Sequence, residues 1–121
     1  MTETVEYQAL LQQNRDILAR HAKSHDLREA REIDISSRFR SKESARAARE
    51  YVERNYEVPS NVLFRVVSHK YTVDDIVIEL AFSFHAVPEP ELITNYEFIL
   101  RDAAEKFEGE TPGWEFAVKP D

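Results

Sequence analysis

The chain has 121 residues, of which 42% are hydrophobic and 32% are charged, and its net charge is −7. Seven Phe, five Tyr and one Trp can fill the core of one domain, so this composition excludes a disordered acidic chain. No cysteine is present, which excludes a disulfide scaffold, a cysteine-ligated zinc site and a thiol nucleophile.

The first predicted element is an amphipathic helix over about residues 4–23. Its apolar residues recur at spacings of three, four and seven, which place them on one stripe. They are Tyr7, Leu10, Leu11, Ile17, Leu18 and Ala22. Asn14 interrupts the stripe, which would serve for packing on the chain's own domain or on a second chain. The acidic start of the chain and its short apolar runs predict neither a secretory signal nor a membrane span, so we expect a cytoplasmic protein.

A strand and a second helix are expected next. Residues 31–39 alternate between apolar and polar, which predicts a half-buried strand with one inward face, Ile33, Ile35, Ser37 and Phe39. Ser41 is a suitable N-cap for a helix over residues 42–55. The inner stripe of that helix consists of Ala45, Ala48 and Val52. Asn55 suits the left-handed backbone position that ends many helices.

Residues 62–84 are typical of a β-hairpin. Two runs rich in β-branched and aromatic residues, 62–73 and 76–84, are joined at Asp74-Asp75. A turn there would place Lys70 opposite Glu79 and Tyr71 opposite Ile78, which are favourable cross-strand pairs.

The last helix shows the most regular periodicity of the chain. Pro88 and Pro90 introduce it, and Gly109 is expected to close it. Its apolar stripe consists of Leu92, Tyr96, Ile99, Leu100, Ala103 and Phe107. A short final strand is predicted from the alternation of Trp114, Phe116 and Val118 with polar or small residues.

Together these elements predict an α+β protein with a ferredoxin-like α/β plait. From about residue 31 to 118 the order is βαββαβ, which gives a four-stranded antiparallel sheet covered by two helices. The N-terminal helix is an addition to this unit. We expect residues 1–121 to form a single domain.

The residues do not favour catalysis, a metal site or a cofactor. The four histidines, His21, His25, His69 and His85, fall on different predicted elements without metal-ligand spacing. With only two glycines the chain has neither a phosphate-binding loop nor a nucleophile elbow. The acids near the end of the last helix are interpreted as surface carboxylates and not as a general acid–base pair.

The charges are distributed unevenly and favour a basic partner. Residues 88–121 contain nine acidic and three basic residues. A basic stripe lies around the second helix and consists of Arg38, Arg40, Lys42, Arg46 and Arg49. The expected strands offer no cluster of outward aromatics for RNA, and Glu32, Asp34 and Glu79 would repel phosphate, so direct nucleic-acid binding is not favoured.

The segment from Ala104 to Glu115 resembles the ribonuclease E inhibitor RraB family. In that family a Gly- and acid-rich turn ends in a Tyr-Asp-Gly-Trp motif. Here Gly113 and Trp114 stand at the last two positions, while Thr111 and Pro112 replace the first two. Further similar segments are Asp26-Leu27, Arg31-Glu32-Ile33 and Tyr56-Glu57-Val58, and a departure is Ile35, where members often have His.

The resemblance extends from about Gln8 to Glu115 and implies both a fold and a role. The implied fold is ferredoxin-like. The implied role is that of a non-catalytic protein that binds the basic scaffold region of endoribonuclease E and lowers RNA degradation. An immunity protein that neutralises a toxin nuclease is the alternative, since a small acidic domain suits a basic nuclease. The candidate protein-binding residues are Asp26, Glu108, Glu110, Trp114 and Glu115.

Overall fold

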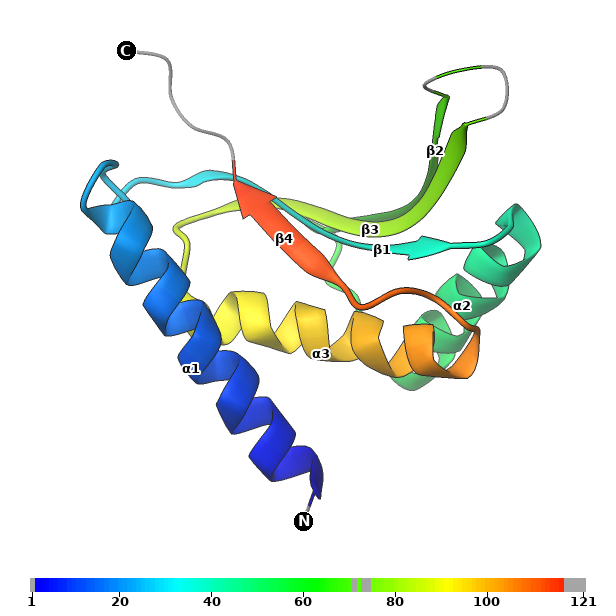
Figure 1. Cartoon of the computed structure of the whole chain (residues 1–121), viewed down its shortest axis with the longest axis horizontal. Helices are drawn as coiled ribbons and strands as arrows, with labels where there is room; N and C mark the ends of the chain where they lie inside the picture. Colours follow the sequence, from blue (N-terminus) through cyan, green and yellow to red (C-terminus); the bar gives the residue numbers. More distant parts are fainter. Residues whose placement is uncertain (1, 71, 73–74, 117–121) are drawn as a thin grey trace.

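The computed structural model describes residues 2–70, 72 and 75–116. Its elements follow the order expected from the sequence (Figure 1). They are α1 (Thr2–Ala22), β1 (Arg31–Phe39), α2 (Lys42–Asn55), β2 (Leu63–Lys70), β3 (Ile76–Ala86), α3 (Pro90–Lys106) and β4 (Gly113–Phe116). Val118, which was expected to extend the last strand, lies outside the described residues.

The four strands form one antiparallel sheet in the order β2-β3-β1-β4. Figure 1 shows α2 and α3 side by side beneath this sheet, so the predicted α/β plait is confirmed. The added helix α1 packs against α3 next to the edge strand β4. Of the two uses considered for its apolar stripe, packing on its own domain is the one observed.

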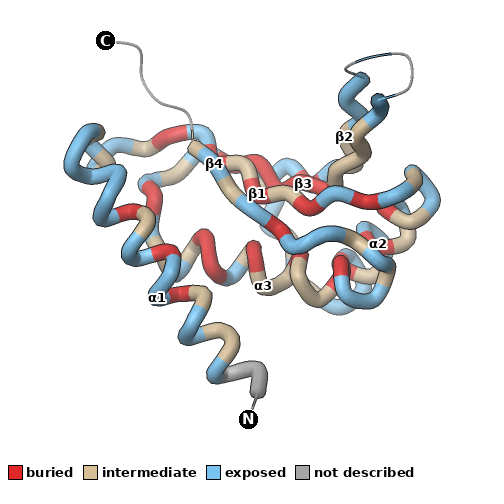
Figure 2. The backbone as a smooth tube through the Cα atoms, in the orientation of Figure 1, coloured by how far each residue is buried: buried red, intermediate tan, exposed pale blue. Residues whose placement is uncertain are grey.

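The inward face of the sheet supplies most of the core. The alternation predicted for β1 is confirmed, because Ile33, Ile35, Ser37 and Phe39 are all buried. Phe82 and Phe84 of β3 lie opposite Ile35 and Ile33 in the ladder. Figure 2 shows the buried residues concentrated in the central strands and on the helix sides that face them. The hydrophobic effect thus fixes which faces of the sheet and helices meet.

Helix α2 begins as predicted but ends differently. The Ser41 side chain accepts a hydrogen bond from the Ser44 backbone N–H at 3.1 Å, which confirms the N-cap. The inner stripe Ala45, Ala48 and Val52 is fully buried. Asn55 is the last helical residue and not a left-handed cap, since Glu108 is the only non-glycine residue with a positive φ among the described residues. The Asn55 amide Nδ2 instead donates to the Tyr51 carbonyl at 2.8 Å. The chain leaves the helix at Tyr56 in an extended conformation.

The hairpin register differs from the prediction. Lys70 lies opposite Ile76, and Glu79 lies opposite Val67, so the expected Lys70–Glu79 pair is absent. Asp-Asp does not favour the positive φ angles of a tight hairpin turn, so packing sets the register. The observed register stacks Phe64 on Phe82 with ring centroids 4.3 Å apart. Tyr71, Val73 and Asp74 lie outside the described residues.

The end of α3 also corrects a prediction. The left-handed position belongs to Glu108, with φ of 57°, and not to Gly109. Gly109, the residue after the left-handed position, caps the end of the helix, because its N–H donates to the Ala104 carbonyl at 2.8 Å. Gly109 is required for a different reason, since an added Cβ would lie 2.7 Å from the Phe39 ring.

Helix α3 is buried on more than one side because it lies between the sheet and α1. Its predicted stripe packs against the core, either fully buried (Leu100 and Ala103) or partly buried (Leu92, Tyr96, Ile99 and Phe107). A second buried side, not foreseen from the sequence, carries Ile93, Thr94, Glu97 and Ala104. In α1, Leu11 and Leu18 are buried as expected, but Ala22 is exposed, and the most buried residue is the polar Asn14.

Candidate functional site

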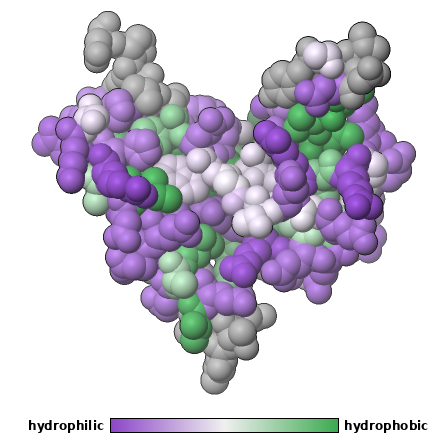
Figure 3. Space-filling model, viewed as in Figure 1, coloured by the Kyte–Doolittle hydropathy of each residue, from purple (hydrophilic) through white to green (hydrophobic). Residues whose placement is uncertain are grey.

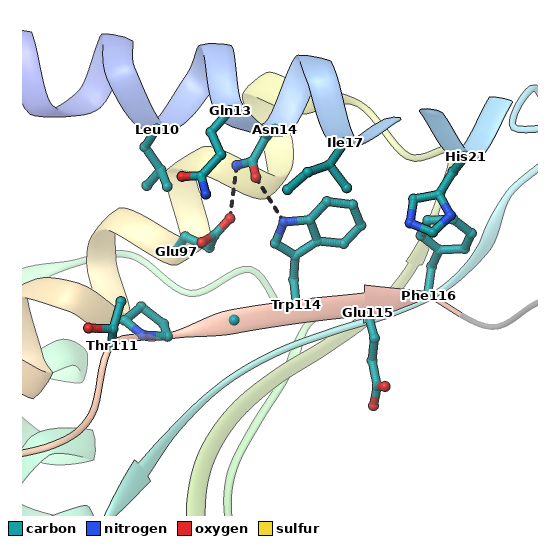
Figure 4. Close-up of a pocket in the computed structure, with 12 residues that line it drawn as sticks. Leu10, Gln13, Asn14, Ile17, His21, Glu97, Thr111, Trp114, Glu115 and Phe116 are labelled. Carbon is teal, nitrogen blue, oxygen red and sulfur yellow. Dashed lines mark hydrogen bonds between the residues drawn. The ribbon is translucent and has the colours of Figure 1, made fainter. Parts of the chain in front are cut away.

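A cleft lies between α1 and β4, with α3 at its base (Figure 4). Its volume is about 430 Å³. Helix α1 contributes Leu10, Gln13, Asn14, Ile17 and His21, and helix α3 contributes Glu97. The remaining wall is the segment Thr111, Pro112, Gly113, Trp114, Glu115 and Phe116. A largely apolar cleft with a few polar groups is the usual form of a binding site.

Helical and strand periodicity place these side chains. Along α1, residues 10, 14, 17 and 21 recur at spacings of four, three and four, which puts them on one side of the helix. Along β4, Trp114 lies opposite Ile35 on the inward face of the sheet. Its neighbour Glu115 points to the other face, as Figure 4 shows.

The amide of Asn14 joins three elements at the base of the cleft. Its Nδ2 donates to Thr94 Oγ1 at 2.9 Å and to Glu97 Oε1 at 2.8 Å, both on α3. Its Oδ1 accepts from Trp114 Nε1 on β4 at 2.8 Å. Asn14 is 1% exposed and uses both amide hydrogens, so the hydrogen bonds expected of a buried amide are made. The amide therefore ties α1 to α3 and to the edge of the sheet.

Glu97 is a buried carboxyl group without a cationic partner. It is 5% exposed, and burial raises the pKa of its carboxyl to about 7, with the Asn14 hydrogen bond acting in the opposite direction. Within the described residues no basic side chain forms an ion pair with it. A charge in this position is costly until something compensates it.

Aromatic rings continue the cleft toward the end of β4. Trp114 and Phe116 are stacked with centroids 5.9 Å apart, and the His21 ring meets Phe116 edge-on at 5.0 Å. The Arg31 guanidinium lies 5.6 Å from the centroid of the Phe116 ring. These flat surfaces suit contact with planar or apolar groups.

Of the five candidate residues named from the sequence, Asp26 lies apart from this cleft. It follows α1 in an exposed loop, where Arg28 contacts it at 3.0 Å. The same guanidinium holds the pKa of the Asp26 carboxyl at about 2, well below its usual range. Asp26 therefore carries a charge that its neighbour already neutralises.

Glu108 and Glu110 are brought together at the opposite end of α3. Both line a shallow hollow of about 320 Å³ beside the apolar residues Ile76, Val77 and Ile78. Figure 3 shows apolar surface along the β2–β3 hairpin on an otherwise largely hydrophilic face. Glu108 lies 3.8 Å from Arg40, and the Glu110 backbone is fixed by hydrogen bonds to Ser37 and Arg38. The structure thus does not gather the candidate acids around Trp114.

The sequence did not point to Asn14 or Glu97. Asn14 was recognised only as an interruption of an apolar stripe, and Glu97 only as one acid among nine. The available signal was positional, because Glu97 precedes Leu100 by three residues and so lies near the inner side of its helix.

The open face of the sheet is mixed in charge. At the described positions β1 presents Glu32, Asp34, Ser36 and Arg38, and β3 presents Glu79 and His85. None of these described positions carries Phe, Tyr or Trp, so they offer bases no cluster of stacking rings. Of the basic stripe, Arg40 and Arg49 have acidic partners, Glu108 and Glu53.

Comparison with known proteins gives one finding about family. The family model RraB, described as regulator of ribonuclease activity B, matches residues 11–116. No curated protein matches the sequence. In the described residues, no helix is long and apolar enough to cross a membrane, and no three His, Cys, Asp or Glu side chains are grouped to hold a metal ion.

Proposed function

The chain belongs to the RraB family of regulators of ribonuclease activity, and from this premise we propose that it is a non-catalytic, protein-binding regulator of endoribonuclease E. It would bind the basic scaffold region of that enzyme and lower its activity, and so slow RNA degradation. The observation that carries the proposal is the family match over residues 11–116, a range that includes the whole base of the cleft between α1 and β4. Family membership favours this partner over the toxin nuclease of the alternative. Residues 1–121 would act as one binding unit.

The charge distribution supports a basic partner. The net charge is −7, and exposed carboxylates of Glu108, Glu110 and Glu115 follow α3. Such surface charges raise the rate of association with a partner of opposite sign more than they tighten the final complex. In this proposal Trp114 is the residue that anchors the partner, and the three carboxylates attract its basic side chains. Asp26 contributes less to this attraction because Arg28 neutralises its charge.

The cleft supports binding over catalysis. Its titratable side chains, His21, Glu97 and Glu115, come from three different elements. Glu97 is held by the uncharged amide of Asn14. General acid–base catalysis requires a titratable group within hydrogen-bond reach of the reacting atoms and a second group to complete the proton transfer.

Binding of the scaffold region tests this proposal. We expect a purified scaffold region of endoribonuclease E to bind the chain, with affinity that falls roughly tenfold between about 50 and 200 mM salt because charge pairing is screened. Replacing Glu108 and Glu110 together with Gln should slow association severalfold and leave dissociation nearly unchanged. Surface plasmon resonance separates the two rates. Absence of binding at low salt would contradict the proposal.

A further inference from the structure

Glu97 is a buried acid beside an open cleft, and its charge is not compensated from within the described chain. The nearest basic residue on its own helix is Arg101, one turn further, and Arg101 pairs with Glu6 at 3.8 Å and with Glu105 at 3.4 Å. On α1, Arg15 pairs with Glu91 at 3.2 Å. A buried carboxylate is normally paired with a cation or hydrogen-bonded by several donors. Among the residues that the structure describes, Glu97 accepts one side-chain hydrogen bond, from Asn14.

The walls of the cleft have the chemistry that an arginine side chain requires. Leu10 and Ile17 provide apolar surface for a methylene stem. The Trp114 indole provides a flat face on which a guanidinium can stack, and it is held in place by its hydrogen bond to Asn14. Glu97 at the base offers acceptor oxygens for the donors of the guanidinium.

We propose that the cleft between α1 and β4 receives an arginine side chain of a protein partner, with the guanidinium on the Glu97 carboxylate and against the Trp114 ring. The proposal rests on the proposed function for the identity of that partner, but the chemistry of the cleft stands independently. Arginine is favoured over lysine because the guanidinium is planar, stacks on aromatic rings and is more weakly hydrated than an ammonium group.

Docking of a guanidinium would release a proton near neutral pH. The free cleft holds Glu97 partly protonated at pH 7, and a cation beside it favours the ionised form. The other titratable side chains that line the cleft are His21 on α1 and Glu115 on β4. Arg31 on β1 lies over the Phe116 ring at the end of the cleft, and Arg15 on α1 and Arg101 on α3 pair with other acids. A Glu97→Gln variant separates the contribution of Glu97 from theirs.

The single tryptophan makes the test direct, because all indole fluorescence of the chain comes from Trp114. The probe is a blocked Gly-Arg-Gly peptide titrated into the full chain, with citrulline or lysine in place of arginine as matched controls. We expect a saturable change in emission with arginine, affinity at least about tenfold weaker with citrulline, and a similar loss in Glu97→Gln. Between pH 6 and 8 the affinity of the wild type should rise about tenfold, and that of Glu97→Gln should stay flat. A Glu43→Gln control, which removes an exposed carboxylate on α2 outside the lining of the cleft, should bind like the wild type.

Binding of the scaffold region, measured beside binding of the peptides, distinguishes failure of the arginine site from failure of the proposed function. If the scaffold region binds the wild type and Glu97→Gln equally, or if arginine and citrulline peptides bind alike, the arginine site is wrong and the proposed function stands. If the arginine peptide binds through Glu97 and the scaffold region does not bind, the site stands and the proposed partner is wrong. Absence of any saturable response to the arginine peptide overturns the site.

Discussion

Replacing Asn14 with alanine should lower the free energy of unfolding by about 2 to 6 kcal/mol. The reason is that the substitution removes the partner of the Trp114 Nε1–H and the donor to the buried Glu97 carboxyl, and each such loss costs about 1 to 3 kcal/mol. Thr94 is affected less, because its hydroxyl keeps its bond to the Pro90 carbonyl at 2.6 Å. Urea unfolding followed by circular dichroism measures the difference.

The matched control for this variant is Gln13→Ala. Gln13 is the preceding residue of α1 and also lines the cleft, but it is exposed. Its replacement should change stability by less than about 0.5 kcal/mol. In Asn14→Ala, Trp114 emission should also shift to longer wavelength as α1 loosens from β4. Equal stability of the two variants would show that the amide of Asn14 does not hold α1 in place.

The second large effect is a pH-dependent gain of stability in Glu97→Gln. The folded pKa of Glu97 is raised from the ordinary 4.5 to about 7, so the wild type is most stable below the unfolded pKa and loses stability as the pH rises through 7. At about 1.4 kcal/mol per pH unit this loss is on the order of 3 kcal/mol. Glutamine keeps an acceptor for Asn14 and carries no charge.

Urea unfolding at two pH values measures this effect. Glu97→Gln should exceed the wild type by on the order of 1 kcal/mol at pH 5 and 3 kcal/mol at pH 8. The exposed Glu115 on the opposite face supplies the control, since Glu115→Gln should change stability by less than about 0.5 kcal/mol. A gap between wild type and Glu97→Gln that does not widen with pH would mean that the carboxyl is solvated in solution.

Local periodicity in the sequence predicts most of the fold. The alternation over residues 31–39 and the alanine stripe of residues 42–55 correspond to β1 and α2 because one buried face imposes its period on the sequence. The predictions that failed concerned chain reversals. The turn after β2 and the end of α3 are decided by Phe64 on Phe82 and by Phe39 against Gly109, contacts that no local pattern encodes.

The cleft could not be predicted for the same reason. The partners of Asn14 are separated from it by 80, 83 and 100 residues, so the sequence offered only a polar residue in an apolar stripe. Trp114 was identified as a candidate because Trp is enriched at binding sites. Glu108, Glu110 and Glu115 are candidates because they are close to Trp114 in sequence, and Asp26 is one because its segment resembles the family. The Glu115 side chain points away from Trp114 to the other face of the sheet, and Glu108 and Glu110 line a separate hollow after the end of α3.

The most direct test of the central claim is RNA cleavage by endoribonuclease E in the presence of the purified chain. The account predicts that the chain slows cleavage by the full-length enzyme at low salt and leaves an enzyme that lacks the scaffold region unaffected. Full-length enzyme that cleaves at the same rate with and without the chain, or equal slowing of both forms, would contradict it.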